Sequence, residues 1–482
     1  MPARLALLAF VLLTAACGAR PVAPLAAVPA APLVDIDALV RQGCYRCLEA
    51  AFEAARGRNT EQAFEVALLL AARAKELGLP HDPWLQEART NLPVAAEWAL
   101  YLEIVTAQQP DPLSGDRDQL LTQSLERRRT RADYDAWGDT LKAGPGSPLL
   151  RAYLDLVVAC REGFGSARAT PEERDAAVTA VVQQFGNVPL IEYRAGLCGG
   201  VEFERLTTVR TAQPDMVDAE LELGKRALQN RVPPDIVEGL QRLRSAREAF
   251  PGSPVVPATI GELHQAREEW PEALAEFDAT LAIIPTHRDA LLGKTVSLSQ
   301  LERYDEALAT ATRLIELGNW FIGPANFWKA WNEYQLNMIT EARADADRAK
   351  ALMVNPALSV LSGMIEWRER RLDTAEKEFQ AAIELDLGQC DAAFYLGSVR
   401  YDRRMWPESL AAFLHAVQCF ELSVVTRREA IAKLSSTPAD AAINARQIAA
   451  HEEAIELAQK RRGDASQNVA ALQKLAAPAA AR

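Results

Sequence analysis

The chain has 482 residues, of which 49% are hydrophobic, so it can bury a core and is not a disordered protein. Its formal net charge of -12 argues against a nucleic-acid partner, because affinity for nucleic acids rests largely on Lys and Arg neutralising phosphates. Aromatic residues make up only 7% and β-branched runs are scarce, so we expect helices almost throughout and no sheet.

The first residues have the order of a secretory signal. One early Arg4 is followed by an apolar run over residues 5–13 and then by small residues, and the run is too short for a comfortable transmembrane helix. The ending LTAAC resembles a bacterial lipobox, in which the signal, here residues 1–16, is cut before a lipid-bearing cysteine. The resemblance implies that Cys17 is the lipid-attachment residue. A plain signal peptide with a chance cysteine is the alternative.

Residues 17–34 are rich in Pro and Ala and show no helical periodicity. We expect an extended tether that spans on the order of 50 Å at about 3.1 Å per residue. Gly18 stands where many inner-membrane lipoproteins of Gram-negative bacteria have an acidic residue. The lipoprotein resemblance therefore favours the outer membrane, with the folded part facing the periplasm.

Residues 35–213 show helical patterns of irregular length with Pro and Gly at the joins, and we interpret them as helical hairpins. Cys44 and Cys47 are three residues apart on one expected helix, where a Cα separation of roughly 5 Å permits a disulfide. No His follows them, as haem attachment would require, and a second pair for zinc is missing. We expect a structural disulfide.

From residue 214 to 423 the sequence repeats with a period near 34. Small residues recur at Ala273, Ala307, Ala342, Ala375 and Ser409, which are 34, 35, 33 and 34 residues apart. A period of this length indicates stacked units, each too small to bury its own apolar face.

Two stretches carry a specific pattern. IGELHQAREEWPEALAEFDATLAIIP contains Gly261, Ala273, Phe277 and Pro285, and YLGSVRYDRRMWPESLAAFLHAV contains Leu396, Gly397, Phe413 and Ala416. Their spacing resembles that of the tetratricopeptide repeat family, whose unit is a helical hairpin. The resemblance implies an all-α, right-handed superhelical solenoid with about six repeats. The units at 288–321 and 323–355 lack the first-helix Gly, and a unit near 217–253 needs extra loop residues.

Two further disulfides are expected from the hairpin arrangement. Cys390 would open the first helix of the last repeat and Cys419 would close its second, and antiparallel neighbours bring those ends together. Cys160 and Cys198 remain as a pair near the ends of helices two apart in order. After the repeats, residues 424–482 are expected to form a polar-flanked capping helix and a disordered tail.

The sequence shows no catalytic or metal-binding constellation. The five His residues are dispersed, and neither a nucleophile elbow nor a Walker loop nor a dinucleotide-binding glycine motif is present. We therefore expect no enzyme, no cofactor and no metal site. A catalytic pair of carboxylates assembled by the fold is an alternative, which two buried acids with displaced titration in one pocket would reveal.

The family resemblance implies that the first helix of each unit lines a concave groove. The groove residues that it implies are Val255, Ala258, Glu262, Gln265, Phe327, Trp331, Tyr334, Val360, Met364, Trp367, Arg368, Phe394, Ser398 and Tyr401. These aromatic residues and Arg368 suit the binding of an extended or helical protein segment. The alternative is that Trp328 and Trp331 are large only because their repeat lacks the Gly and must fill more space.

The sequence thus predicts a membrane-anchored scaffold that binds protein partners in the cell envelope. Its expected task is to assist assembly or organisation of an envelope or secretion complex, with membrane contact through the N-terminal lipid only. The alternative is a receptor or accessory lipoprotein for a small molecule or glycan, in which residues 35–213 and the superhelix enclose a deep pocket.

Overall fold

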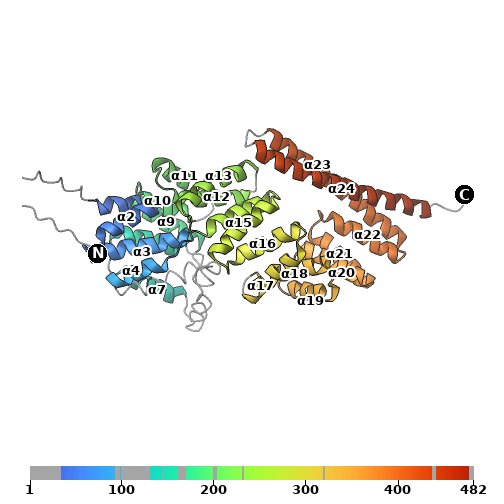
Figure 1. The fold of residues 1–482 in the computed structure, drawn as a ribbon, viewed down its shortest axis with the longest axis horizontal. Helices are drawn as coiled ribbons and strands as arrows, with labels where there is room; N and C mark the ends of the chain where they lie inside the picture. Colours follow the sequence, from blue (N-terminus) through green and yellow to red (C-terminus); the bar gives the residue numbers. More distant parts are fainter. Residues whose placement is uncertain are drawn as a thin grey trace, which may run out of the picture. The chain divides into compact units, whose positions relative to one another are not determined.

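The computed structural model describes residues 34–92, 98, 131–144, 146–160, 170–198, 203–230, 233–318, 321–436 and 441–476, and every regular element in these ranges is a helix (Figure 1). The chain separates into a unit over Met1–Asp35 and a second unit over Ile36–Arg482, and only the second is described below. The expected signal peptide, Cys17, nearly all of the tether and the last six residues lie outside the described residues.

The N-terminal part of the second unit is a set of helices with a shared apolar core. Helix α3 is buried around almost its whole circumference between residues 63 and 74, as its continuous apolar sequence dictates. Side chains cap several N-termini: Asn59 caps α3, Ser147 caps α8, and Thr170 forms a capping box with Glu173 on α9. The helices are α1 (Ile36–Gln42), α2 (Tyr45–Ala55), α3 (Thr60–Glu76), α4 (Asp82–Asn91), α7 (Arg131–Lys142), α8 (Pro148–Ala159), α9 (Pro171–Phe185), α10 (Pro189–Gly196) and α11 (Phe203–Ala212).

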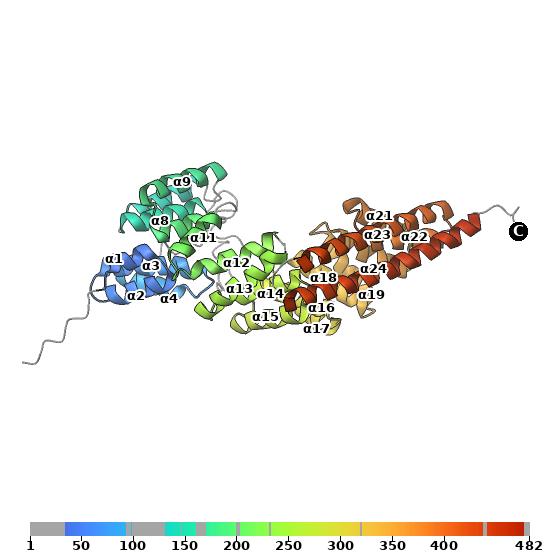
Figure 2. The ribbon, with the colours of Figure 1, turned by 90° about the horizontal axis from the view of Figure 1, so that it is seen from above.

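The C-terminal part is a series of helical hairpins, and six of them follow one another within the described residues (Figure 2). They pair α12 (Asp218–Asn230) with α13 (Pro233–Ala249), α14 (Val255–Ala266) with α15 (Trp270–Ile283), α16 (Arg288–Gln300) with α17 (Tyr304–Glu316), α18 (Ile322–Gln335) with α19 (Ile339–Lys350), α20 (Pro356–Arg368) with α21 (Leu372–Leu385), and α22 (Cys390–Asp402) with α23 (Trp406–Ser436). The described chain is an all-α repeat solenoid, as the sequence predicts.

Five of these hairpins share one turn. In each, a residue with positive φ follows the first helix, and the next N–H donates to a carbonyl five residues back, as Glu269 N does to His264 O at 2.9 Å. This is a Schellman motif, which satisfies carbonyls left free at a helix end. The positive-φ residues are Glu268, Glu302, Asn337, Arg370 and Arg404, spaced like the sequence repeat although none is Gly.

The hairpins differ in how they fill the contact between their two helices. In α20–α21 the ring of Phe379 lies directly over Gly363, and a Cβ added to that Gly would come within 2.7 Å of the ring. A hairpin that lacks this Phe also lacks the Gly. In α18–α19, for example, the equivalent buried residues are Ala330 and Ala346. In α18–α19 a smaller pair therefore replaces the Gly–Phe pair, and neighbouring side chains such as Phe327 fill the remaining volume.

The first helices of successive hairpins, from α12 to α22, pack against one another in a row. The second helices pack mainly on their own partner and on the following first helix. The row of first helices is therefore the tighter side of the array, and we call its solvent-facing surface the inner face. This arrangement positions the expected binding residues.

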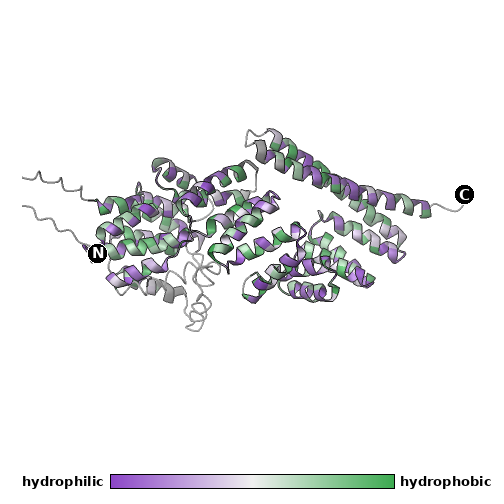
Figure 3. Cartoon of the chain, in the orientation of Figure 1, coloured by the Kyte–Doolittle hydropathy of each residue, from purple (hydrophilic) through white to green (hydrophobic). Residues whose placement is uncertain are grey.

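The last hairpin differs from the expected domain boundary at residue 423. Helix α23 continues unbroken to Ser436 and then pairs with α24 (Ala441–Ala476), and hydrophilic and hydrophobic residues alternate along both helices (Figure 3). Buried residues recur at multiples of seven on both helices, as at Phe413 and Phe420 and at Ala458 and Ala465, which is the spacing of a coiled-coil seam. Among the described helices, α23 alone is long and apolar enough to cross a membrane, with a third of its most apolar window buried.

Candidate partner-binding face

The inner face carries a cluster of aromatic residues on α18 and α20. Trp331, Tyr334, Met364 and Trp367 are each half-buried, with one side against the hydrophobic core and the other accessible. Together with the exposed Arg368 they form what we call the aromatic face. Each of these side chains is partly exposed to solvent, as contact with a partner requires.

Polar contacts fix two of these side chains. Trp367 Nε1 donates to Asp402 Oδ2 at 3.0 Å, so its ring is held between α20 and α22. Arg368 donates to Asn337 Oδ1 at 2.6 Å, and its guanidinium lies 5.4 Å from the centre of the Tyr334 ring. The ring of Trp367 also lies 5.9 Å from that of Tyr395, a residue that the sequence did not single out. Preorganised rings of this kind lose little side-chain entropy on binding.

Phe327 differs from the sequence expectation. It is only 8% exposed and packs edge-on to Trp328 with ring centres 5.2 Å apart, so it belongs to the core of α18–α19. The Ala330–Ala346 contact leaves space that the ring of Phe327 fills from the side. Val360 and Ala258 are likewise buried, and these three residues are not accessible groove residues.

Phe394 is half-buried beneath the chain's own C-terminal helix. Arg461 of α24 lies 5.9 Å from the centre of its ring and 3.8 Å from Asp391 Oδ1, and Ala458 and Ala465 of α24 belong to the same buried cluster. Sequence reasoning missed this cover, because α24 is separated from α22 by about forty residues and carries no repeat signal. Phe394 is therefore unavailable to a partner while α24 stays in place.

The remaining expected groove residues divide by their contacts. Tyr401 is 45% exposed and packs edge-on to Trp406 at 5.0 Å. Gln265 bridges two repeats, because its amide donates to Gly293 O at 2.8 Å and to Ser297 Oγ at 3.0 Å. Ser398 donates to the backbone of its own helix, and Val255 is half-buried.

Two carboxylates lie on the inner face toward the N-terminal end of the array. Burial, and then the charge of Asp289, raises the pKa of Glu262 to about 7, and burial also raises the pKa of Asp289. Glu262 lies on α14 and Asp289 on the first turn of α16. Displaced titration of two acids is part of what a catalytic pair would show, and the two carboxylates are also placed to bind a cationic group of a ligand.

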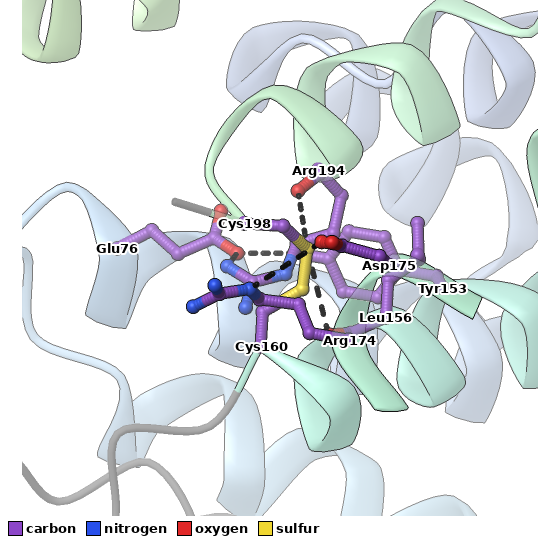
Figure 4. The surroundings of a disulfide bond; sticks show 8 residues. All are labelled: Glu76, Tyr153, Leu156, Cys160, Arg174, Asp175, Arg194 and Cys198. Atoms are coloured by element: carbon purple, nitrogen blue, oxygen red, sulfur yellow. Dashed lines mark hydrogen bonds and ion pairs between the residues drawn. A yellow bond between two sulfur atoms is a disulfide. The ribbon is translucent and has the colours of Figure 1, made fainter. Parts of the chain in front are cut away.

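A buried charged cluster joins helices in the N-terminal part. The guanidinium of Arg73, which is fully buried, donates to Asp218 Oδ1 at 2.7 Å and contacts Glu76. Arg194 and the Tyr153 hydroxyl each donate to Glu76 Oε1 at 2.8 Å, and these three residues are drawn in Figure 4. Burial alone would raise the pKa of Glu76, but the two guanidinium groups lower it. Every charge is matched, so the cluster joins helices and leaves no free acid or base.

The three expected cysteine pairs lie at disulfide distance. Cα–Cα separations are 4.9 Å for Cys44–Cys47, 4.8 Å for Cys160–Cys198 and 5.3 Å for Cys390–Cys419. Cys44 also caps α2, since its sulfur accepts from the Cys47 N–H at 3.0 Å. The Cys160–Cys198 pair lies beside the buried charged cluster (Figure 4).

A hollow of about 670 Å³ lies on α21, away from the inner face. Its lining is mostly charged: Asp373, Glu376, Lys377, Gln380, Ala381, Glu384 and Arg403. This hollow is not the deep pocket between residues 35–213 and the array that a small-molecule receptor would need. Among the described residues, no group of three or more His, Cys, Asp or Glu side chains is placed to hold a metal ion.

No protein-family model and no curated protein matches the chain. Among solved structures, it is similar to YrrB, a TPR protein with an unusual peptide-binding site, at 21% identity over 37% of this chain and 91% of that one, with a TM-score of 0.31. It is also similar to PilF of Pseudomonas aeruginosa (16% identity, 41% and 89% covered, TM-score 0.36) and to PilW, a type IV pilus biogenesis factor (14% identity, 46% and 95% covered, TM-score 0.36).

The repeat assignment rests on the chain's own hairpins and not on these distant likenesses. The period near 34 and the shared Schellman turn occur together in α14 to α23, and three of these five hairpins pair a Gly with a Phe at the helix contact. The hairpins from α14 to α23 are therefore successive copies of one helical unit, which resembles the tetratricopeptide repeat.

Proposed function

We propose that this chain is a scaffold that binds a segment of a partner protein on its aromatic face. The single observation that carries the proposal is the half-exposure of Trp331, Tyr334, Met364 and Trp367 on neighbouring first helices, with Arg368 beside them. Aromatic residues and Arg dominate the energy of protein interfaces, and a solenoid exposes them along a continuous surface.

The shape of the aromatic face also explains why a protein segment fits it better than a small molecule does. The aromatic face extends over two adjacent helices and is open to solvent, whereas small-molecule sites enclose most of the ligand surface. A segment of several residues can place successive side chains against successive repeats.

We further propose that the scaffold is tethered to a membrane of the cell envelope through a lipid on Cys17 and helps to assemble an envelope or secretion complex. The support is the signal-like start of the sequence and the Pro- and Ala-rich stretch after it. Three cysteine pairs at disulfide distance suit an oxidising compartment such as the periplasm.

The binding face is tested by site-specific photocrosslinking in cells that naturally make the protein. A photoreactive residue in place of the exposed Arg368 should give a protein adduct on illumination. The same residue in place of Lys377, exposed on the neighbouring α21, is the matched control and should give none. Equal adducts at both positions, or none at position 368, would count against the aromatic face as the binding site.

The tether is tested separately by metabolic labelling with a fatty acid. The wild-type chain should incorporate label and fractionate with membranes, and a Cys17→Ala variant should do neither. Equal labelling of the two chains would remove the anchor and leave the binding face untouched.

A further inference from the structure

We infer that the bound segment is extended and carries a basic side chain about seven or eight residues from an end that holds aromatic and acidic side chains. The inference rests on the proposed function, because it identifies the partner of the same inner face. It depends on an unmatched negative charge at one end of that face and an unmatched positive charge at the other.

The negative end consists of Glu262 and Asp289. Within the described part of the chain, no basic side chain forms an ion pair with either carboxylate. The nearest cations are engaged elsewhere: Lys225 binds Glu222 Oε1 at 2.7 Å, and Arg288 donates to Leu317 O at 2.9 Å. Two half-buried carboxylates without a counterion gain most from a cation that arrives with a ligand.

The positive end is Arg368. Its contacts are the Asn337 amide oxygen and the Tyr334 ring, and among the described residues no carboxylate pairs with it. The other arginines near it are paired, since Arg370 binds Asp402 and Arg371 binds Glu366. Arg368 is exposed next to the rings of the aromatic face, so an incoming carboxylate could form a bidentate pair with it.

The repeat geometry sets the distance between the two ends. Helices α16, α18 and α20 pack in sequence along the inner face, and helices in contact lie about 8–10 Å apart. The axes of α16 and α20 are therefore about 16–20 Å apart. Asp289 lies in the first turn of α16 and Arg368 is the last residue of α20, so the path also runs about 16 Å along the helix direction and is about 23–26 Å long. An extended chain spans about 3.3–3.6 Å per residue, so about seven or eight residues cover the path. Trp331 and Tyr334 of α18 lie between the two charged ends and favour apolar or aromatic side chains there.

Titration of Glu262 supports the same assignment. Its pKa of about 7 means that half of this negative charge is lost near neutral pH in the free protein. A basic ligand side chain stabilises the ionised carboxylate, so binding should be stronger at pH 8 than at pH 6.

The test is a selection from a random twelve-residue peptide library displayed on phage, with the full chain as the immobilised target. Selections run in parallel on the wild type, on Glu262→Gln/Asp289→Asn, on Arg368→Gln and on Trp331→Ala/Trp367→Ala. Circular dichroism confirms the fold of each variant. Enriched peptides are then synthesised, and their dissociation constants are measured at pH 6 and pH 8.

We expect peptides with Lys or Arg about seven or eight residues from an aromatic or acidic cluster, bound at least tenfold more weakly by the carboxylate variant and by Arg368→Gln. Peptides that need Trp331 and Trp367 but show no basic enrichment, or that ignore the carboxylate variant, would overturn this inference and leave the proposed function standing. Peptides that bind the Trp331→Ala/Trp367→Ala variant equally well, or a selection without enrichment, would overturn both.

Discussion

The contact between Gly363 and Phe379 tests how the repeats are packed. A Gly363→Ala substitution adds a methyl group whose carbon would lie 2.7, 2.8 and 2.9 Å from three atoms of the Phe379 ring. The ring is fully buried and its neighbours are well packed, so it has little room to move. The related hairpin α18–α19 carries Ala at both equivalent positions, Ala330 and Ala346, which suggests that the clash disappears when both residues change.

The expected magnitudes follow from the packing. Overpacking costs about 1–3 kcal/mol and is offset by about 1 kcal/mol of helix propensity gained when Ala replaces Gly, so Gly363→Ala should destabilise by about 1 kcal/mol. Phe379→Ala opens a cavity and should cost about 3–5 kcal/mol. In the double variant the clash is gone and the new methyl group fills part of the cavity. Its cost should fall below the sum of the two single costs by about 2 kcal/mol.

The assay is urea unfolding followed by circular dichroism, with hydrogen exchange of the α20–α21 amides to report the local free energy, because repeat arrays need not unfold in one step. Gly463→Ala in α24 is the matched control, since no atom lies within 4 Å of the added Cβ, and it should stabilise by about 1 kcal/mol. If Gly363→Ala stabilises as much as Gly463→Ala, or if the double variant loses the full sum, the packing argument is wrong.

Three further predictions concern single side chains. Glu302 is exposed and has φ of 58°, so Glu302→Gly should stabilise by about 0.5–1 kcal/mol in urea unfolding while Glu302→Ala does not, and equal effects would refute backbone strain as the cause. The pKa of Glu262 is raised to about 7, so its contribution to stability is fully present below pH 4 and is lost as the pH rises through 7. At pH 8.5 the Glu262→Gln variant should therefore melt at a higher temperature than the wild type, with a free energy of unfolding about 1–2 kcal/mol larger, and at pH 5 the two melting temperatures should be nearly equal. Arg73→Leu leaves Asp218 buried without its cation and Glu76 with Arg194 alone, and it should cost about 3–5 kcal/mol, which thermal unfolding would show; a loss below 1 kcal/mol would mean that water reaches the cluster.

The repeat architecture could be predicted from the sequence because each hairpin is specified locally. Small residues at Ala273 and Ala307 and the turn after each first helix recur at a fixed period, and packing between neighbouring hairpins repeats with them. The turn itself was not predicted. Its positive-φ position holds Glu, Asn or Arg instead of Gly, so composition gives no sign of it, and only the hydrogen bonds identify it.

The inner face was harder to predict, because exposure depends on what packs against each repeat from outside it. A family register assigns Phe327 and Phe394 to equivalent positions, yet the first is in the core and the second lies beneath α24. In α18–α19 the small Ala330–Ala346 pair leaves room that a large neighbour must fill, and sequence spacing cannot say which neighbour turns inward.

The cover of Phe394 also bears on how a partner would bind. Arg461 reaches Asp391 and the Phe394 ring from α24, while its neighbour Arg462 lies 3.7 Å from Glu421 of α23. Most of the buried surface of α24 lies against α23, which leaves α22 contacted chiefly through this arginine and a few alanines. Helix α24 is thus held in place mainly by α23, and it covers α22 while making few contacts with it. The aromatic face on α18 and α20 therefore lies between the carboxylates of α14 and α16 on one side and the helix pair α22 and α24 on the other, where Tyr401 stays exposed and Phe394 is covered.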